Sequence, residues 1–135
     1  MTSPKETTKS EEPSIHELHK LKLEFPVGQD YSLQKQIGKG SYGTVVLAKH
    51  LPTSKMVAIK KLDEVFLYVK DAKRILREII LLRELNNHRN VIRLYDIIVT
   101  EDPKTFSTLY LVFEHAASDI RKVYRSKYFL SERHI

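Results

Sequence analysis

The sequence predicts an α+β fold, with a five-stranded antiparallel sheet and one long helix between the third and fourth strands. Short segments that alternate apolar and polar residues, or that are rich in β-branched residues, recur along the chain between turn residues. One long stretch instead repeats its apolar residues at helical spacing. Helices gathered on one side of an antiparallel sheet give an α+β architecture.

The first three strands are expected to follow one another closely. Tyr31–Ile37 alternates apolar and polar residues, as a half-buried strand does. Thr44–Ala48 is rich in β-branched residues and is expected to return as the second arm of a hairpin. Leu51–Ser54 has turn chemistry, and Met56–Ile59 then has the composition of a well-buried strand.

The long helix is expected at Val69–Leu85, where apolar residues recur at helical spacing. These residues are Ile75, Leu76, Ile79, Ile80 and Leu82. Two more strands are expected at Val91–Val99 and Leu109–Phe113, separated by a polar loop that contains Pro103. A further helix is expected to begin at Asp119, and Ser131-Glu132 has the composition of another helix start.

Residues 1–24 are mostly Ser, Thr, Lys, Glu and Pro. Such a segment buries too little apolar surface to offset its ordering entropy, so we expect a flexible extension. A short apolar stripe at its end leaves a docked helix or strand open as an alternative. The stripe consists of Ile15, Leu18, Leu21, Leu23 and Phe25.

The composition is that of an ordinary globular protein, with 41% apolar and 30% charged residues. The absence of cysteine excludes disulfides and thiolate metal sites. No apolar run approaches the ~18 residues that span a bilayer, and no signal core follows Met1, so we expect a cytoplasmic and/or nuclear protein. The net charge of +6 is scattered among acidic residues, which indicates solvated surface rather than a nucleic-acid or membrane partner.

A glycine-rich segment between the first two strands is the first functional signal. Gly38-Lys39-Gly40-Ser41-Tyr42-Gly43-Thr44-Val45 has the pattern G-x-G-x-x-G-x-V. Glycines let main-chain N–H groups approach phosphate oxygens, although three glycines alone often form only a flexible turn. A dinucleotide-binding loop would lead into a helix, and a Walker loop would end in Gly-Lys-Ser/Thr. This segment joins two strands, which favours a hairpin folded over ATP.

The second signal is a lysine with a distant carboxylate. Lys60 follows the buried stretch Val57-Ala58-Ile59, where a lysine alone would usually be a surface charge. Glu78, however, lies mid-helix at the boundary of the buried face, so the two side chains can pair. Such a pair orients the lysine toward the α- and β-phosphates, and positions it more than it stabilises the fold.

With these residues in order, Phe25–Ile135 resembles the amino-terminal lobe of eukaryotic protein kinases, and most closely the mitogen-activated Ser/Thr kinases. The similarity is carried by Ile37-Gly38, Val57-Ala58-Ile59-Lys60-Lys61, Arg74-Ile75-Leu76-Arg77-Glu78-Ile79, His88-Arg89-Asn90-Val91-Ile92 and the loop Thr100–Thr108. Cyclin-dependent kinases share several of these features and remain an alternative, although their helix usually carries a cyclin-binding signature that is absent here.

The resemblance implies an ATP-binding lobe at 25–112, a hinge at 113–120 and the first helices of a second lobe at 121–135. It assigns ATP contacts in the loop to Ile37, Gly38, Lys39, Gly40, Ser41, Tyr42, Gly43, Thr44 and Val45. Val45 and Ala58 would sandwich the adenine, with Phe113 as the gatekeeper at the back of the pocket. Lys60 and Glu78 would be the catalytic pair.

The hinge and the helix would supply the remaining contacts. Glu114 and Ala116 would present backbone groups to the adenine edge, and Asp119 would accept from the ribose hydroxyl. Arg74 and Arg77 match the arginines that bind an activation-loop phosphothreonine, a task that suits the bidentate guanidinium. The alternative for both arginines is a solvated helix face.

Phosphoryl transfer also needs an Asp that orients the substrate hydroxyl, and an Asp and an Asn that hold magnesium. His88-Arg89-Asn90 does not supply the first, because Asn90 replaces the carboxylate and the segment precedes the fourth strand. Residues 1–135 contain no His-Arg-Asp, Asp-Phe-Gly or Ala-Pro-Glu sequence. We therefore expect this chain alone to bind nucleotide weakly, not to phosphorylate protein, and to need Mg²⁺ only as part of a complete kinase.

Three hypotheses remain open: a piece of a mitogen-activated kinase, a naturally short regulatory or binding module, and a basic phosphate- or nucleic-acid-binding domain. The third lacks exposed aromatic and basic clusters. Implied partners are ATP and the second lobe, with protein substrates and an upstream kinase for the complete enzyme. Apolar groups near the lobe junction also predict a homodimer or swapped oligomer. They are Leu85, Val112, Phe113, Val123, Tyr124, Tyr128 and Phe129.

Overall fold

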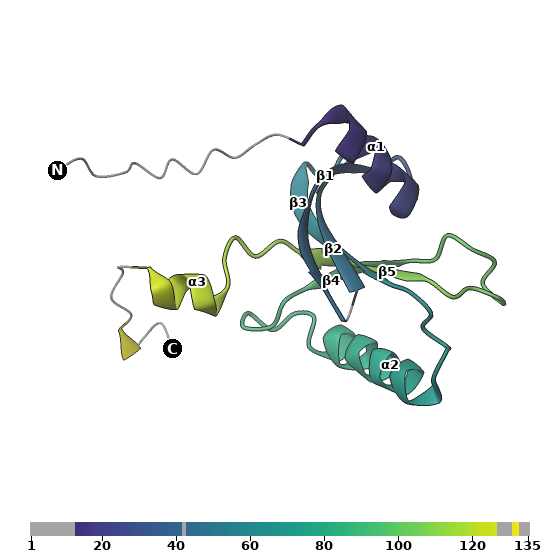
Figure 1. Ribbon diagram of the computed structural model, residues 1–135. Helices are drawn as coiled ribbons and strands as arrows, with labels where there is room; N and C mark the ends of the chain where they lie inside the picture. Colours follow the sequence, from purple (N-terminus) through teal and green to yellow (C-terminus); the bar gives the residue numbers. More distant parts are fainter. Residues whose placement is uncertain (1–12, 42, 127–130, 133–135) are drawn as a thin grey trace.

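The computed structural model describes residues 13–41, 43–126 and 131–132 (Figure 1). The described strands are β1 (Tyr31–Gly40), β2 (Gly43–His50), β3 (Lys55–Leu62), β4 (Leu94–Ile98) and β5 (Leu109–Glu114). The described helices are α1 (Ile15–Glu24), α2 (Val69–Glu84) and α3 (Ile120–Arg125). None of these helices is long and apolar enough to cross a membrane.

The five strands form one antiparallel sheet in the order β1-β2-β3-β5-β4, with α2 between β3 and β4 in the chain. The predicted α+β fold is therefore confirmed. The fourth strand starts later than the expected Val91, because the amide of Val91 donates to the carbonyl of His88 in a turn. The side-chain oxygen of Asn86 then accepts from the amide of Leu94, where β4 begins.

The two faces of the sheet carry separate cores, because successive strand residues point to opposite sides. Figure 1 shows α1 on one side of the sheet and α2 on the other. The α1-face core consists of Leu21, Phe25, Val27, Leu33, Val46, Ala48, Val57, Ile59, Tyr110 and Val112. The α2-face core consists of Leu62, Val65, Leu94, Leu109, Leu111 and Phe113, with half-buried residues packed against it.

Helix α1 begins with a capping box at Ser14. The Ser14 hydroxyl accepts from the amide of Glu17 at 3.2 Å, and the Ser14 amide donates to the Glu17 carboxylate at 2.8 Å. These two bonds hold the pKa of Glu17 below its ordinary value. Leu21 and Phe25 are buried against the sheet, so the apolar stripe forms a docked helix. We therefore place residues 15–24 with the lobe rather than with the flexible extension.

Helix α2 rests on the sheet through one of its two apolar stripes. Ile75, Ile79 and Leu82 are half-buried against the α2-face core. Leu76 and Ile80, which belong to the other stripe, are 57% and 51% exposed. The described part of the chain buries no residue of α2 completely.

Helix α3 starts where the sequence predicts, because the Asp119 carboxylate accepts from the amide of Lys122 at 2.7 Å and caps the helix. Val112 and Phe113, expected near a lobe junction, are buried in the sheet, whereas Leu85 and Tyr124 are exposed. Tyr42, Tyr128, Phe129 and most of the helix expected from Ser131 lie outside the described residues.

Candidate functional site

The glycine-rich hairpin, formed by β1, β2 and their turn, ends in the pair Gly40–Gly43. Gly43 has a φ of +112°, and a Cβ at this position would collide with the backbone carbonyl oxygen of Lys61. Only glycine allows this approach without strain. By contrast, a Cβ on Gly40 would meet no described atom within 4 Å. The tip of the hairpin therefore lies directly on β3, next to Lys60.

The predicted ion pair joins β3 to α2. The Nζ of Lys60 lies 3.1 Å from Oε1 of Glu78, with 21% and 42% of the two side chains exposed. Strand alternation turns Lys60 toward the α2 face, and the helix positions Glu78 beside the inward residues Ile75 and Ile79. Charge-assisted bonds of this kind are stronger than neutral ones and direct the ammonium group.

The hairpin, β3 and α2 enclose a cleft of about 560 Å³. Its lining includes Gly40, Ser41, Gly43, Thr44, Lys60 and Glu78. It thus combines a glycine-rich backbone with a lysine held by a carboxylate, which is the chemistry of a phosphate site.

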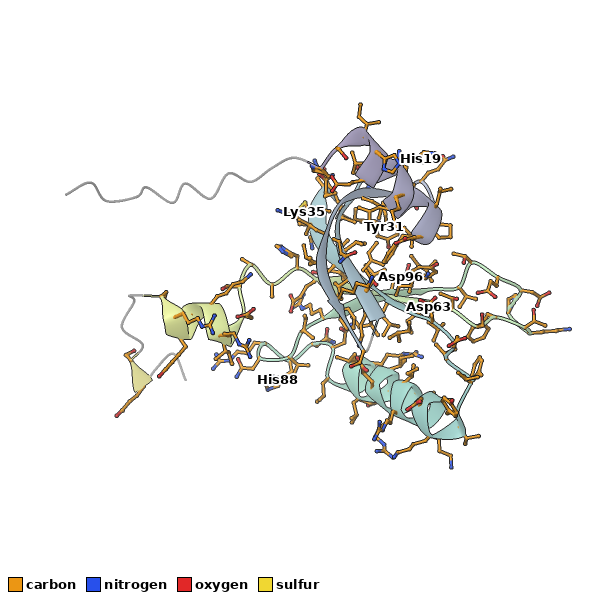
Figure 2. All side chains as sticks on the ribbon, in the orientation of Figure 1. His19, Tyr31, Lys35, Asp63, His88 and Asp96 are labelled. Carbon is orange, nitrogen blue, oxygen red and sulfur yellow. The ribbon has the colours of Figure 1, made fainter. Side chains whose placement is uncertain are left out.

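Acidic residues that the sequence analysis did not single out also line this cleft. Asp63, labelled in Figure 2, lies in the connection from β3 to α2 and pairs with Lys61 at 3.1 Å. Asp71 pairs with Arg74 at 3.8 Å. The i,i+3 spacing of Asp71 and Arg74 in a predicted helix was the signal that could have identified this pair.

The residues expected to hold the adenine share a face with Lys60. Val45 pairs with Lys60 across β2 and β3, and Ala58 pairs with Phe113 across β3 and β5. Val45 and Ala58 are half-buried, whereas Phe113 is only 8% exposed and packs in the α2-face core. The three side chains lie beside the cleft rather than in its lining.

The hinge residues have other partners. The amide of Glu114 donates to the carbonyl of Arg93 at 2.9 Å, and its carboxylate accepts from the amide of Arg93 at 3.0 Å. Asp119 is occupied as the α3 cap, and Ala116 is exposed after β5. The structure therefore does not bring Glu114 or Asp119 to the cleft lining.

The two predicted phosphothreonine-binding arginines are placed differently. Arg74 lines the cleft, with 61% of its side chain exposed. Arg77 is exposed and lies outside that lining. Only Arg74 is thus in position to contact a group bound beside Lys60.

Residues 13–41, 43–126 and 131–132 contain no group of three or more His, Asp or Glu side chains placed to hold a metal ion. The cleft as described can bind and orient phosphate through Lys60 and the hairpin backbone. Residues 1–135 carry no catalytic-loop motif that would activate a hydroxyl nucleophile.

Comparison with known proteins shows which family this sequence resembles. The family model for the protein kinase domain matches residues 31–135. Mitogen-activated protein kinase 12 of Oryza sativa subsp. japonica is 41% identical over 111 residues, covering 82% of this chain and 19% of the relative. Mitogen-activated protein kinase 16 of Arabidopsis thaliana is 40% identical over the same length, with the same coverage. The chain spans about a fifth of the length of the curated relatives it matches. It belongs to the protein kinase domain family.

Proposed function

We propose that this chain binds ATP in the cleft between the glycine-rich hairpin, β3 and α2. We further propose that the complete protein transfers the γ-phosphate to Ser or Thr of protein substrates, as a mitogen-activated-type kinase. The observation that carries the proposal is the 3.1 Å pair between Lys60 and Glu78 directly beside the tip of the hairpin. The names of the similar proteins favour the mitogen-activated group over the cyclin-dependent one.

Each part of the cleft has a task in this proposal. The backbone at Gly40 and Gly43 approaches the phosphates, and Lys60, held by Glu78, neutralises the charge between the α- and β-phosphates. Val45 and Ala58 supply apolar contact for the adenine. Mg²⁺ would supply neutralisation of phosphate charge in the complete protein, which would also provide its ligands and the general base.

The neighbouring lysines provide a matched test. Lys60 and Lys61 each pair with a carboxylate at 3.1 Å and have 21% and 22% of their side chains exposed, but they point to opposite faces of β3. The affinity for a fluorescent ATP analogue is measured by titration for the wild type, Lys60→Ala and Lys61→Ala. Losing one charge-assisted hydrogen bond costs about 1.5–3 kcal/mol, so Lys60→Ala should raise the Kd about 10- to 150-fold.

Lys61→Ala should leave the Kd unchanged, since Lys61 is not part of the cleft lining. Equal losses in both variants would show that general positive charge, and not this site, holds the nucleotide. A wild-type chain that binds none of the analogue would contradict the proposed nucleotide site itself.

A further inference from the structure

The match to the protein kinase domain begins at Tyr31, but the chain before it is part of the folded core. We call residues 15–27 the α1 segment. It contributes Leu21, Phe25 and Val27 to the α1-face core, each no more than 7% exposed. The segment therefore lies outside the matched family domain and yet inside the packed lobe.

The α1 segment contacts the glycine-rich hairpin through β1. Residues of α1 and of the hairpin line a shared cleft of about 460 Å³, with Glu17 and Glu24 on the helix and Lys35 and Lys39 on β1. Lys35 lies beside α1 in Figure 2. Lys20 of α1 also lines the cleft and pairs with Glu24 at 3.9 Å, so the helix side keeps one net negative charge, which the two lysines attract weakly.

The same segment contacts β5, the strand that leads to the hinge. The hydroxyl of Tyr110 donates to the carbonyl of Glu24 at 3.3 Å, and the rings of Tyr110 and Phe25 lie 5.7 Å apart. Tyr110 pairs in register with Lys61, the neighbour of Lys60. In the sheet, β2 and β3 lie between β1 and β5. The α1 segment therefore connects two strands that are not adjacent.

We propose that the α1 segment regulates the nucleotide site by fixing the glycine-rich hairpin relative to β5. The proposal rests on the proposed ATP site. A hairpin that is already held in position loses less conformational freedom when nucleotide binds, so docking of α1 raises the affinity. Release of α1 would lower it, which makes this helix a built-in control element added to the domain.

Linkage makes the effect reciprocal. If docking of α1 favours nucleotide binding, then nucleotide must favour docking of α1 by the same factor. Saturating ATP analogue should therefore slow amide hydrogen exchange at residues 18–27, which lie on the α1 face and do not line the proposed ATP cleft.

Two leucines of the same helix give a matched pair of variants. Leu21 is 7% exposed and Leu23 is 71% exposed. Leu21→Ala should speed amide exchange at residues 35–40 and 43–46 and raise the Kd of the ATP analogue about 5- to 150-fold, the usual range of coupling between sites. Leu23→Ala should change neither, and the volume-conserving Leu21→Met should restore both.

Urea unfolding, followed for every variant, identifies conditions in which each chain is folded before exchange and binding are compared. Tyr110→Phe keeps the ring and removes the hydroxyl that bonds Glu24 and Thr100, so it decides the question if Leu21→Ala does not fold. It should move exchange and Kd in the same direction, but less. The proposal is overturned if folded Leu21→Ala keeps the wild-type hairpin exchange and the wild-type Kd. If Leu21→Ala is unfolded, the same result in Tyr110→Phe overturns it. In either case α1 would be a purely structural element.

The two proposals fail in different ways. A wild-type chain that does not bind the analogue contradicts the ATP site, while the exchange rates of Leu21→Ala and Leu23→Ala still measure whether α1 holds the hairpin. Nucleotide binding with identical hairpin exchange in both leucine variants contradicts the role of α1 alone.

Discussion

The helices on the two faces of the sheet are held in opposite ways. Helix α2 carries Glu78, but the described part of the chain buries none of its residues, and Leu76 and Ile80 face outward. Helix α1 carries no site residue, yet its Leu21 and the following Phe25 are in the core. The helix with the chemistry is thus loosely seated, and the helix outside the matched domain is anchored. Since a loosely seated helix can shift at little cost, the geometry of the Lys60–Glu78 pair depends on what else contacts α2.

The largest expected effect is on stability and tests the packing of the α1 face. Phe25→Ala should lower the free energy of unfolding by about 3–5 kcal/mol, because it opens a cavity under a ring that is 2% exposed. Phe66→Ala is the control on the α2 side, since Phe66 is 60% exposed and its ring lies 5.0 Å from that of Phe106, which packs against that core. Urea unfolding measures both, and equal losses would remove the difference between the faces.

A smaller effect is expected at the tip of the glycine-rich hairpin. Gly43→Ala places a side chain at positive φ and against the carbonyl of Lys61, and should cost about 1–3 kcal/mol. Gly40→Ala meets no described atom and should be close to neutral. If thermal unfolding shows the two alanine variants to be equally stable, the tip does not rest on β3 as described.

The smallest effect concerns alkaline pH and again the α1 face. Burial raises the pKa of Tyr110 above its ordinary value of 10.0, and Lys61 partly opposes this shift. The folded chain therefore keeps this proton at a pH where the unfolded chain loses it, so stability falls as pH rises above 10 toward the folded-state pKa.

Tyr110→Phe should make the fall in stability above pH 10 shallower. Tyr124→Phe, at an 82% exposed position on α3, should keep the wild-type slope. Urea unfolding between pH 8 and 11 gives the slopes. A steeper decline of stability in Tyr110→Phe would contradict the raised pKa of Tyr110 in the folded chain.

Much of this lobe could be predicted because strand alternation and helical spacing are local signals. They placed the strands, α2 and the pairing of Lys60 with Glu78. The insertion of β5 between β3 and β4 could not be predicted, since no local pattern encodes strand order. The role of Asp119 could not be predicted from the sequence either. A carboxylate at the start of a helix can cap the helix or bind a ligand, and here it accepts a hydrogen bond from a helix amide.

There is a physical reason why the sequence did not decide whether residues 15–24 form a helix. This segment is polar enough to suggest disorder, and Leu21 and Phe25 are buried only through packing against the α1 face of the folded sheet. The signal that could have identified its start was the capping-box pattern of Ser14 and Glu17, which needs no tertiary structure.

The buried position of Phe25 separates two kinds of boundary. The family model matches from Tyr31, but the packed core starts before it, with the ring of Phe25 buried on the α1 face of the sheet. A chain cut at Tyr31 would lose Leu21, Phe25 and Val27, and would uncover the residues clustered with them, among them Val57, Ile59 and Val112. The family model therefore marks the matched domain, whereas the packing of the lobe also depends on residues that precede that match.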